Sequence, residues 1–115
     1  YPENCVAYTG THDNETIAGW FESIKPEEQK LARDYLCDHY TPVEELHLPF
    51  ISLVMRSQAR MCIIPLQDYL CLGTEARINL PSTLGNNWKW RLVPGQVTDE
   101  MLEKMCHLNK LFGRL

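Results

Sequence analysis

Hydrophobic residues form two short continuous runs in this chain, one near its start and one past its midpoint. The first covers residues 5–8 and ends before Gly10, and the second covers residues 61–64 and ends at Pro65. Short apolar runs without polar alternation are typical of strands in parallel sheets, which are covered on both faces. We therefore expect buried strands at about residues 4–9 and 60–66.

Apolar residues recur at helical spacing in the first half of the region between the two runs. Asn14 is a good N-cap for a helix that starts near Ile17, and Pro26 suits the first turn of a second helix. The expected apolar face of this second helix consists of Leu31, Ala32, Tyr35 and Leu36. Two successive helices are therefore predicted after the first strand.

The second half of that region predicts two further helices. Residues 41–44, with the sequence Thr-Pro-Val-Glu, match a capping box at the start of a short helix. Residues 49–57 are apolar around most of the helix circumference, so we expect this segment to pack between two layers.

The chain ends with a long irregular segment and a last helix. Residues 73–96 are rich in Gly, Pro and Asn and have no periodicity, which predicts a loop of the length that usually carries function. Thr98 is placed to cap a helix over about 98–112, and Gly113 to stop it. The order strand, helices, strand, loop, helix predicts two β/α units of a parallel α/β fold.

Two parallel strands leave unpaired edges and uncovered apolar faces. We therefore expect more of the same fold, or a second copy of the chain, to cover them. The first residue is Tyr1 rather than Met, which suggests a piece of a longer protein.

Composition narrows the class of protein. The formal charge of −4 and the scattered Lys and Arg residues argue against a nucleic-acid partner. No apolar run approaches the roughly 18 residues that span a bilayer, and no signal segment opens the chain. The cysteines are odd in number and unclustered, as in reduced intracellular proteins. Cys37 and His39 could be two metal ligands, but the chain has no C-x-x-C motif, so the evidence for a zinc site is weak. A cytoplasmic protein without a metal site is expected.

Polar residues follow both predicted strands where a parallel α/β fold places its chemistry. His12 and Asp13 follow the first strand, and Gln67 and Asp68 follow the second. Because the carboxyl ends of parallel strands share one rim, these side chains are expected to converge there. Taken alone, the His12-Asp13 dipeptide favours Asp13 as a turn residue or helix cap, and Gln67 and Asp68 are equally well explained as caps of a short helix.

Three longer strings decide between these interpretations. They are VAYTGTHDNETIAGW at 6–20, IIPLQDYLCLGTEARINLP at 63–81 and NNWKWRL at 86–92. In this order and spacing they closely resemble the C-terminal part of the amylomaltases, which are the 4-α-glucanotransferases or disproportionating enzymes of the α-amylase superfamily. The resemblance covers nearly the whole chain, and only residues 25–48 are unremarkable.

The resemblance implies a TIM-type (β/α)8 barrel of which this chain supplies the last two β/α units. Strand seven would lie at about 4–9, strand eight at about 60–66, a glucan-facing loop at 73–96 and the final helix at 98–112. It also implies a retaining transfer of α-1,4-glucan segments through a covalent glycosyl-enzyme, with the 4-hydroxyl of another glucan as acceptor. No cofactor is implied. The family's nucleophile and acid/base follow strands four and five, so the 115 residues alone are expected to be inactive.

The family's THD motif supplies a third carboxylate, which falls on Asp13. A fixed carboxylate stabilises the positive charge that develops on the sugar ring as the glycosidic bond breaks. By the same motif His12 is expected to donate hydrogen bonds to that sugar, and Asn79 matches a loop residue that touches the glucan. Trp88 and Trp90 would share one side of an extended segment, either as sugar platforms or as packing residues.

The remaining rim residues are expected to support the site. Gln67 and Asp68 would line or brace the rim, and Glu75 and Arg77 could pair to hold the loop. Where the family often has glycine in an N-x-P-G-T string, this chain has Ser82, which resists the positive φ that glycine allows at a loop corner.

Two other functions fit parts of the pattern. A non-catalytic carbohydrate-binding or interaction module would use Trp88, Trp90 and Asn79 without needing Asp13. A metal-dependent HD phosphohydrolase would need further ligands on a helical scaffold. The other histidines, His39, His47 and His107, do not follow predicted strands, which disfavours the phosphohydrolase.

Overall fold

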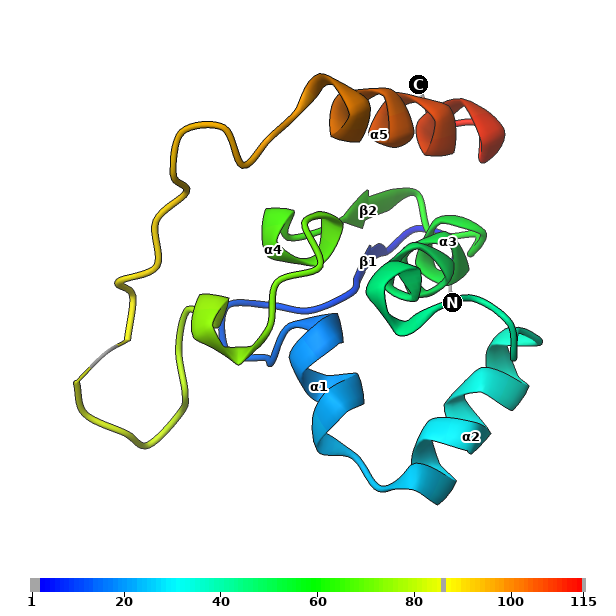
Figure 1. Cartoon of the computed structure of the whole chain (residues 1–115). Coiled ribbons are helices and arrows are strands. Elements are labelled where there is room, and N and C mark those ends of the chain that lie inside the picture. Colours follow the sequence, from blue (N-terminus) through cyan, green and yellow to red (C-terminus); the bar gives the residue numbers. More distant parts are fainter. Residues whose placement is uncertain (1–2, 86, 115) are drawn as a thin grey trace.

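The structure is a computed structural model that describes residues 3–85 and 87–114. Strands β1 (Val6–Tyr8) and β2 (Met61–Ile63) pair in parallel, with Val6 opposite Met61 and Tyr8 opposite Ile63. The connection between them contains α1 (Ile17–Ser23), α2 (Pro26–Leu36), the 3₁₀ helix η1 (Val43–Glu45) and α3 (His47–Met55). After β2 come α4 (Leu66–Tyr69), the 3₁₀ helix η2 (Thr74–Ala76) and α5 (Asp99–Leu111). Figure 1 shows α3 beside the strands and α5 above them.

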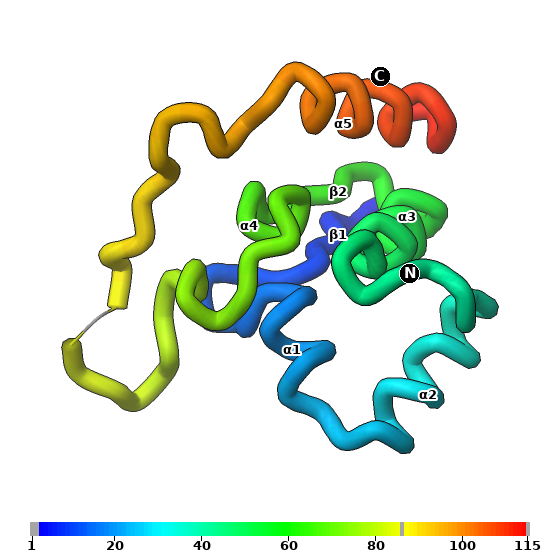
Figure 2. The backbone as a smooth tube through the Cα atoms, in the orientation of Figure 1, coloured from blue at the N-terminus to red at the C-terminus, as the bar shows by residue number. Residues whose placement is uncertain are grey.

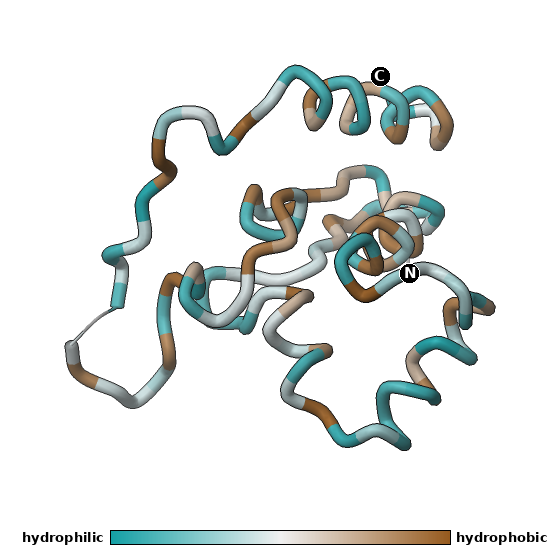
Figure 3. The backbone as a smooth tube through the Cα atoms, viewed as in Figure 1, coloured by the Kyte–Doolittle hydropathy of each residue, from teal (hydrophilic) through white to brown (hydrophobic). Residues whose placement is uncertain are grey.

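The helices build the core on one side of the sheet. Side chains of α1, α3, α4 and α5 form one buried cluster, which consists of Ile17, Ile51, Met55, Tyr69 and Leu108. A second cluster joins Ala7 of β1 to Val54 and Ala59. Hydrophobic residues are concentrated in α3 and in the segment through β2 and α4, as Figure 3 shows. This apolar character of α3 is why it packs between the sheet and the other helices, as predicted.

The prediction that the strands are buried on both faces is wrong for the described residues. Burial alternates along each strand, so that Ala7 is buried while its neighbours are exposed. The exposed strand side chains are Val6, Tyr8, Met61 and Ile63. Since successive strand residues point to opposite faces, the helices cover one face of this sheet and leave the other open.

The helices that follow begin where they were predicted, but two of the predicted capping residues are wrong. Thr16, not Asn14, caps α1, and its hydroxyl accepts a 3.1 Å hydrogen bond from Gly19 N–H. Thr41 does not cap η1, because Asp38 accepts hydrogen bonds from both the amide and the hydroxyl of Thr41. Thr and Asp side chains bind nearby backbone groups in several geometries, so a capping pattern can close a turn instead.

Helix α2 begins at Pro26 as predicted, but its apolar face is not buried. Leu31 and Tyr35 are 68% and 74% exposed, and no residue of α2 is buried. Leu31 and Tyr35 of the predicted apolar face of α2 are therefore exposed to solvent, like the open face of the sheet.

The last third of the chain follows the prediction closely. From Arg77 to Val97 the described residues form no helix or strand, and Figure 2 shows this segment passing along one side of the molecule to reach α5. Thr98 caps α5 by accepting from Met101 N–H, and Gly113 ends it with a φ of 66°. Among the described residues no helix is long and apolar enough to cross a membrane.

Candidate functional site

His12 and Asp13 lie in a tight turn that directly follows β1. The turn is closed by its end residues, because Asn14 N–H donates to the Thr11 carbonyl at 3.1 Å and Thr11 N–H donates to Asn14 Oδ1 at 2.8 Å. With Thr16 capping α1, the Asp13 carboxylate is needed neither for the turn nor for the cap. The interpretation of Asp13 as an ordinary turn residue or helix cap therefore loses its support.

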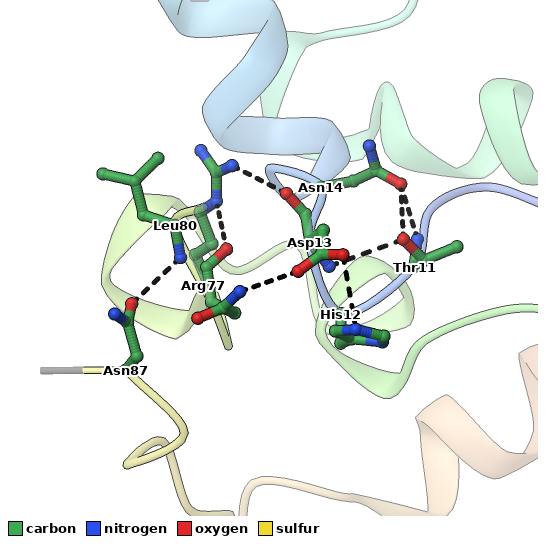
Figure 4. A network of polar contacts seen from close by, with 8 residues as sticks. Thr11, His12, Asp13, Asn14, Arg77, Leu80 and Asn87 are labelled. Carbon is green, nitrogen blue, oxygen red and sulfur yellow. Dashed lines mark hydrogen bonds and ion pairs between the residues drawn. The ribbon is translucent and has the colours of Figure 1, made fainter. Parts of the chain in front are cut away.

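The carboxylate of Asp13 is held by side chains on both of its oxygens. Asn79 Nδ2 donates to Oδ1 at 2.7 Å, and His12 Nε2 lies 3.3 Å from Oδ2 (Figure 4). The Asp13 side chain remains 48% exposed. A fixed carboxylate that still faces open space can accept further hydrogen bonds from a ligand.

The loop after β2 binds this turn through its backbone as well. Asn79 N–H donates to the His12 carbonyl at 3.1 Å, and the Arg77 guanidinium donates to the carbonyls of Asp13 and Asn79 at 2.8 and 3.0 Å. Arg77 holds the loop as predicted, but not by an ion pair with Glu75. Glu75 instead accepts from Gly73 N–H at 3.0 Å.

Trp88 lies against His12, with ring centroids 4.9 Å apart and planes tilted by 36°. Its backbone has a φ of 61°, and its N–H donates to the Ile78 carbonyl at 2.6 Å. The extended segment expected for Trp88 and Trp90 is therefore wrong at Trp88. The Trp88 side chain is 64% exposed, so one aromatic surface stays open beside His12 and Asp13.

Gln67 and Asp68 are buried beneath the site, and their side chains bind the segment after β1 and the η2 turn after β2. Asp68 accepts from Thr9 Oγ1 at 2.6 Å and from Ile17 N–H at 2.8 Å, at the two ends of the segment that carries His12 and Asp13. Gln67 Nε2 donates to the Ala76 carbonyl at 3.3 Å. These contacts are the bracing that we expected, and direct contact of either side chain with a glucan stays a prediction.

A further tie joins Glu15 and Thr74, whose hydroxyl donates to Glu15 Oε2 at 2.9 Å. Gly19 makes room for it, because a Cβ at that position would lie 2.8 Å from Glu15 Oε1 and 2.9 Å from Thr74 Oγ1. Thr9, Glu15 and Thr74 were not predicted from the sequence as residues of this site. Their positions in the strings 6–20 and 63–81 were the only available signal.

The two loops line an open pocket of about 440 Å³ at the carboxyl ends of the strands, next to Asp13, Asn79 and Trp88, which are not part of its lining. Tyr8 and Ile63 line it at the strand ends, and His12, Asp68 and Arg77 line it from the loops. This volume is within the range of small-ligand sites, which combine apolar walls with a few fixed polar groups. Among residues 3–85 and 87–114 no group of three or more His, Cys, Asp or Glu side chains is placed to hold a metal ion.

This arrangement defines a parallel α/β protein whose polar site lies at the carboxyl ends of its strands. The family model for 4-alpha-glucanotransferase matches residues 1–97, and the chain belongs to that family. A 4-alpha-glucanotransferase of Clostridium butyricum is 45% identical over 115 residues, and one of Thermus thermophilus is 43% identical over 98 residues. These matches cover 99% and 83% of this chain, but only 23% and 20% of the relatives.

The fold agrees with this family. A solved amylomaltase from Streptococcus agalactiae, in complex with acarbose, matches with a TM-score of 0.91 and 32% identity over 99% of this chain and 23% of that one. The chain thus spans about a quarter or less of the proteins that it matches. A relative from Solanum tuberosum, 37% identical over 100% of this chain and 20% of its own length, is chloroplastic/amyloplastic. The expected cytoplasmic location therefore stays a prediction.

Proposed function

We propose that the 115 residues of this chain form the last two β/α units of the catalytic barrel of a full-length 4-alpha-glucanotransferase. In this proposal β1 and β2 are strands seven and eight, and the 73–96 loop faces the glucan. The parallel pairing of β1 with β2 supports this, as does the site at their carboxyl ends, where TIM barrels carry their catalytic residues.

Asp13 is the transition-state-stabilising carboxylate in this proposal. The observation that carries it is the fixed yet half-exposed Asp13 side chain, held by Asn79 and His12 although neither the turn nor α1 needs it. As the glycosidic bond breaks, positive charge grows on the sugar ring, and a preorganised carboxylate binds that state better than the neutral ground state. The nucleophile and the proton donor would come from elsewhere in the full-length enzyme.

The neighbouring residues would bind the same sugar. His12 is oriented by Trp88 on its ring face and by Asp13 at Nε2, which leaves Nδ1 to form a hydrogen bond with a sugar hydroxyl at a defined angle. Asn79 donates to Asp13 and would contact the glucan through its remaining amide groups. The exposed face of Trp88 would stack on a pyranose ring. Substrates would be α-1,4-glucans and maltooligosaccharides, in keeping with the acarbose complex of the Streptococcus agalactiae relative.

The alternative is a non-catalytic carbohydrate-binding module, which the exposure of Trp88 also favours. Such a module needs Trp88 and Asn79 but not the charge of Asp13. The two proposals therefore differ in what Asp13→Asn does to turnover.

The test is the disproportionation of maltotriose by the full-length enzyme with Asp13→Asn. We expect kcat to fall by about 10²–10³ or more with a much smaller change in KM, because the charge acts in the transition state. The matched control is Asp34→Asn, since Asp34 is 51% exposed and pairs with His39 at 2.6 Å, but outside the site. Near wild-type turnover in Asp13→Asn, with maltooligosaccharide binding kept, would favour the binding module.

A further inference from the structure

We propose that Arg77 is a positioning residue that fixes Asp13 and Asn79 relative to each other. This inference rests on the proposed function, because it concerns how the stabilising carboxylate is held. Arg77, Asp13 and Asn79 form a closed ring of hydrogen bonds, which Figure 4 draws as dashed lines with Arg77 and Asp13 labelled.

Each bond of the ring is short and joins a different pair. Arg77 Nη2 donates to the main-chain carbonyl of Asp13 at 2.8 Å, and Arg77 Nε donates to the carbonyl of Asn79 at 3.0 Å. Asn79 Nδ2 closes the ring on Asp13 Oδ1 at 2.7 Å. One guanidinium thus holds the backbones of the two residues whose side chains bind each other.

Arg77 is itself anchored before it enters the ring. Its N–H donates to the Thr74 carbonyl at 3.0 Å, which completes the η2 turn, and Thr74 is tied to Glu15. The base of the Arg77 side chain therefore sits on a fixed turn, while its tip reaches the loop after β1. Arg77 is half-buried, and its hydrogen bonds to the two carbonyls are strong because the donor is a charged guanidinium that is partly shielded from water.

The ring is needed because the bond between Asp13 and Asn79 is exposed. A single hydrogen bond at the surface contributes little net free energy, since water offers the same interactions. Asp13 and Asn79 also lie on loops rather than on strands or helices. Without Arg77 the backbone bond from Asn79 N–H to the His12 carbonyl still joins the two loops, but the Asp13 main chain loses its own tie, and Asp13 would then occupy the productive position for a smaller fraction of the time.

Lysine cannot replace arginine in this role. The Arg77 contacts use donors on two different nitrogens of one planar group, which reach two carbonyls together. A lysine ammonium is a compact charge on a flexible stem and does not reproduce this fork. Asp68 and the Glu15–Thr74 pair tie the same loops further from the site, so they hold the loops together but do not orient Asp13.

The experiment measures kcat, KM and melting temperature for the full-length enzyme with Arg77→Met, Arg77→Lys, Asp13→Asn and the double variant Arg77→Met/Asp13→Asn. We expect Arg77→Met to lower kcat about 10²-fold with little change in KM, because small displacements of a catalytic group cost this much. Arg77→Lys should recover less than a tenth of the lost activity. Arg56→Met is the matched control, since Arg56 is exposed at the end of α3, which leads into the amino end of β2.

The double variant separates positioning from an independent role. If Arg77 acts through Asp13, Arg77→Met should cost less than about threefold once Asp13 is Asn, because coupled residues are non-additive. An equal loss in both backgrounds, or unchanged kcat in Arg77→Met, would overturn the inference. If Arg77→Met does not fold, Arg77→Lys replaces it, and its effect on kcat is compared in the wild-type and Asp13→Asn backgrounds in the same way. An active Asp13→Asn enzyme contradicts the proposed function itself, whereas an inactive Asp13→Asn beside a normal Arg77→Met contradicts only the role of Arg77.

Discussion

Ser82 adopts a left-handed backbone conformation, although it stands where the family often has glycine and serine resists this conformation. Its φ is 64°, at a corner of the exposed loop that also contains the site residue Asn79. A non-glycine residue in this region costs about 1–2 kcal/mol, which glycine avoids at some cost in chain entropy. The loop therefore keeps its corner in spite of the serine.

We expect Ser82→Gly to raise the free energy of unfolding by roughly 0.5–1 kcal/mol, the strain relieved less the entropy that glycine loses. Urea denaturation of the chain measures this. Ser52→Gly, in the interior of α3, is the control and should destabilise, because glycine is a poor helix former. An unchanged or lower stability of Ser82→Gly would show that the corner is not strained.

His47 is buried at the start of α3, and its Nδ1 has no hydrogen-bond partner among the described residues. Burial lowers the pKa of His47 below its ordinary 6.5, and the nearby Lys104 lowers it further, against the opposing effects of Asp68, Glu45 and a Tyr69 backbone hydrogen bond. The folded state therefore favours the neutral imidazole.

The stability of the chain should decrease as the pH falls below about 6.5, because the unfolded state then binds a proton that folded His47 resists. The stability from this group is fully present above that pH. Unfolding curves between pH 7.5 and 5.5 test this, with His47→Gln as the comparison. The difference in slope between the two proteins reports His47 alone, and equal slopes would contradict the assignment.

The sequence predicted which residues lie together in the site, but it did not predict the hydrogen bonds and caps that hold them in place. His12, Asp13 and Asn79 lie together in the structure, where strand order had placed His12 and Asp13 at the rim and the family resemblance had added Asn79. The capping of α1 by Thr16 instead of Asn14 could not be predicted, since both residues are good caps two positions apart and only the turn geometry decides. The partners of Arg77 depend in the same way on loop conformation, which has no periodic pattern in the sequence.

At the scale of elements, α2 and α3 differ sharply in what their apolar residues do. Leu31 of α2 is exposed, whereas Ile51 of α3 is completely buried in the main core cluster. Helix α2 is held by polar contacts from its middle, where Gln29 donates to the Phe21 carbonyl at 2.8 Å and Arg33 donates to the Thr41 carbonyl at 2.9 Å. Its stability therefore depends little on its apolar face.

We expect Leu31→Gln to change the free energy of unfolding of the chain by less than about 0.5 kcal/mol, as exposed substitutions usually do. Ile51→Ala should cost about 2–5 kcal/mol because it leaves a cavity in the core. Thermal or urea unfolding of the two variants compares them. A large loss in Leu31→Gln would mean that α2 packs more closely on the molecule than its exposure indicates.

At the scale of the whole molecule, the open face of the sheet presents Val6, Tyr8, Met61 and Ile63 to solvent. Within residues 3–85 and 87–114 each strand pairs on one side only, which leaves an edge on the other. Uncovered apolar faces and strand edges promote association. In the proposed full-length enzyme the remaining barrel would cover them.

The 115 residues on their own should therefore form dimers or larger assemblies. Light scattering coupled to size exclusion measures the mass. Met61→Lys and Ile63→Lys, which place charges on the open face, should shift the population toward monomer. A monodisperse wild-type monomer would contradict the expectation that this face needs a partner.

The central claim is that the negative charge of Asp13 opposes a positive charge on the reacting sugar. The most direct measurement compares two ligands of the full-length enzyme at a pH at which the bridging amine of acarbose is protonated: acarbose itself and a neutral thio-linked maltotetraose that resists cleavage. Asp13→Asn should weaken acarbose at least about tenfold more than the neutral ligand, a difference of roughly 1.4 kcal/mol. Asp34→Asn should change neither. Equal weakening of both ligands by Asp13→Asn would contradict the claim, because a residue that only binds or supports the site does not distinguish the charged ligand from the neutral one.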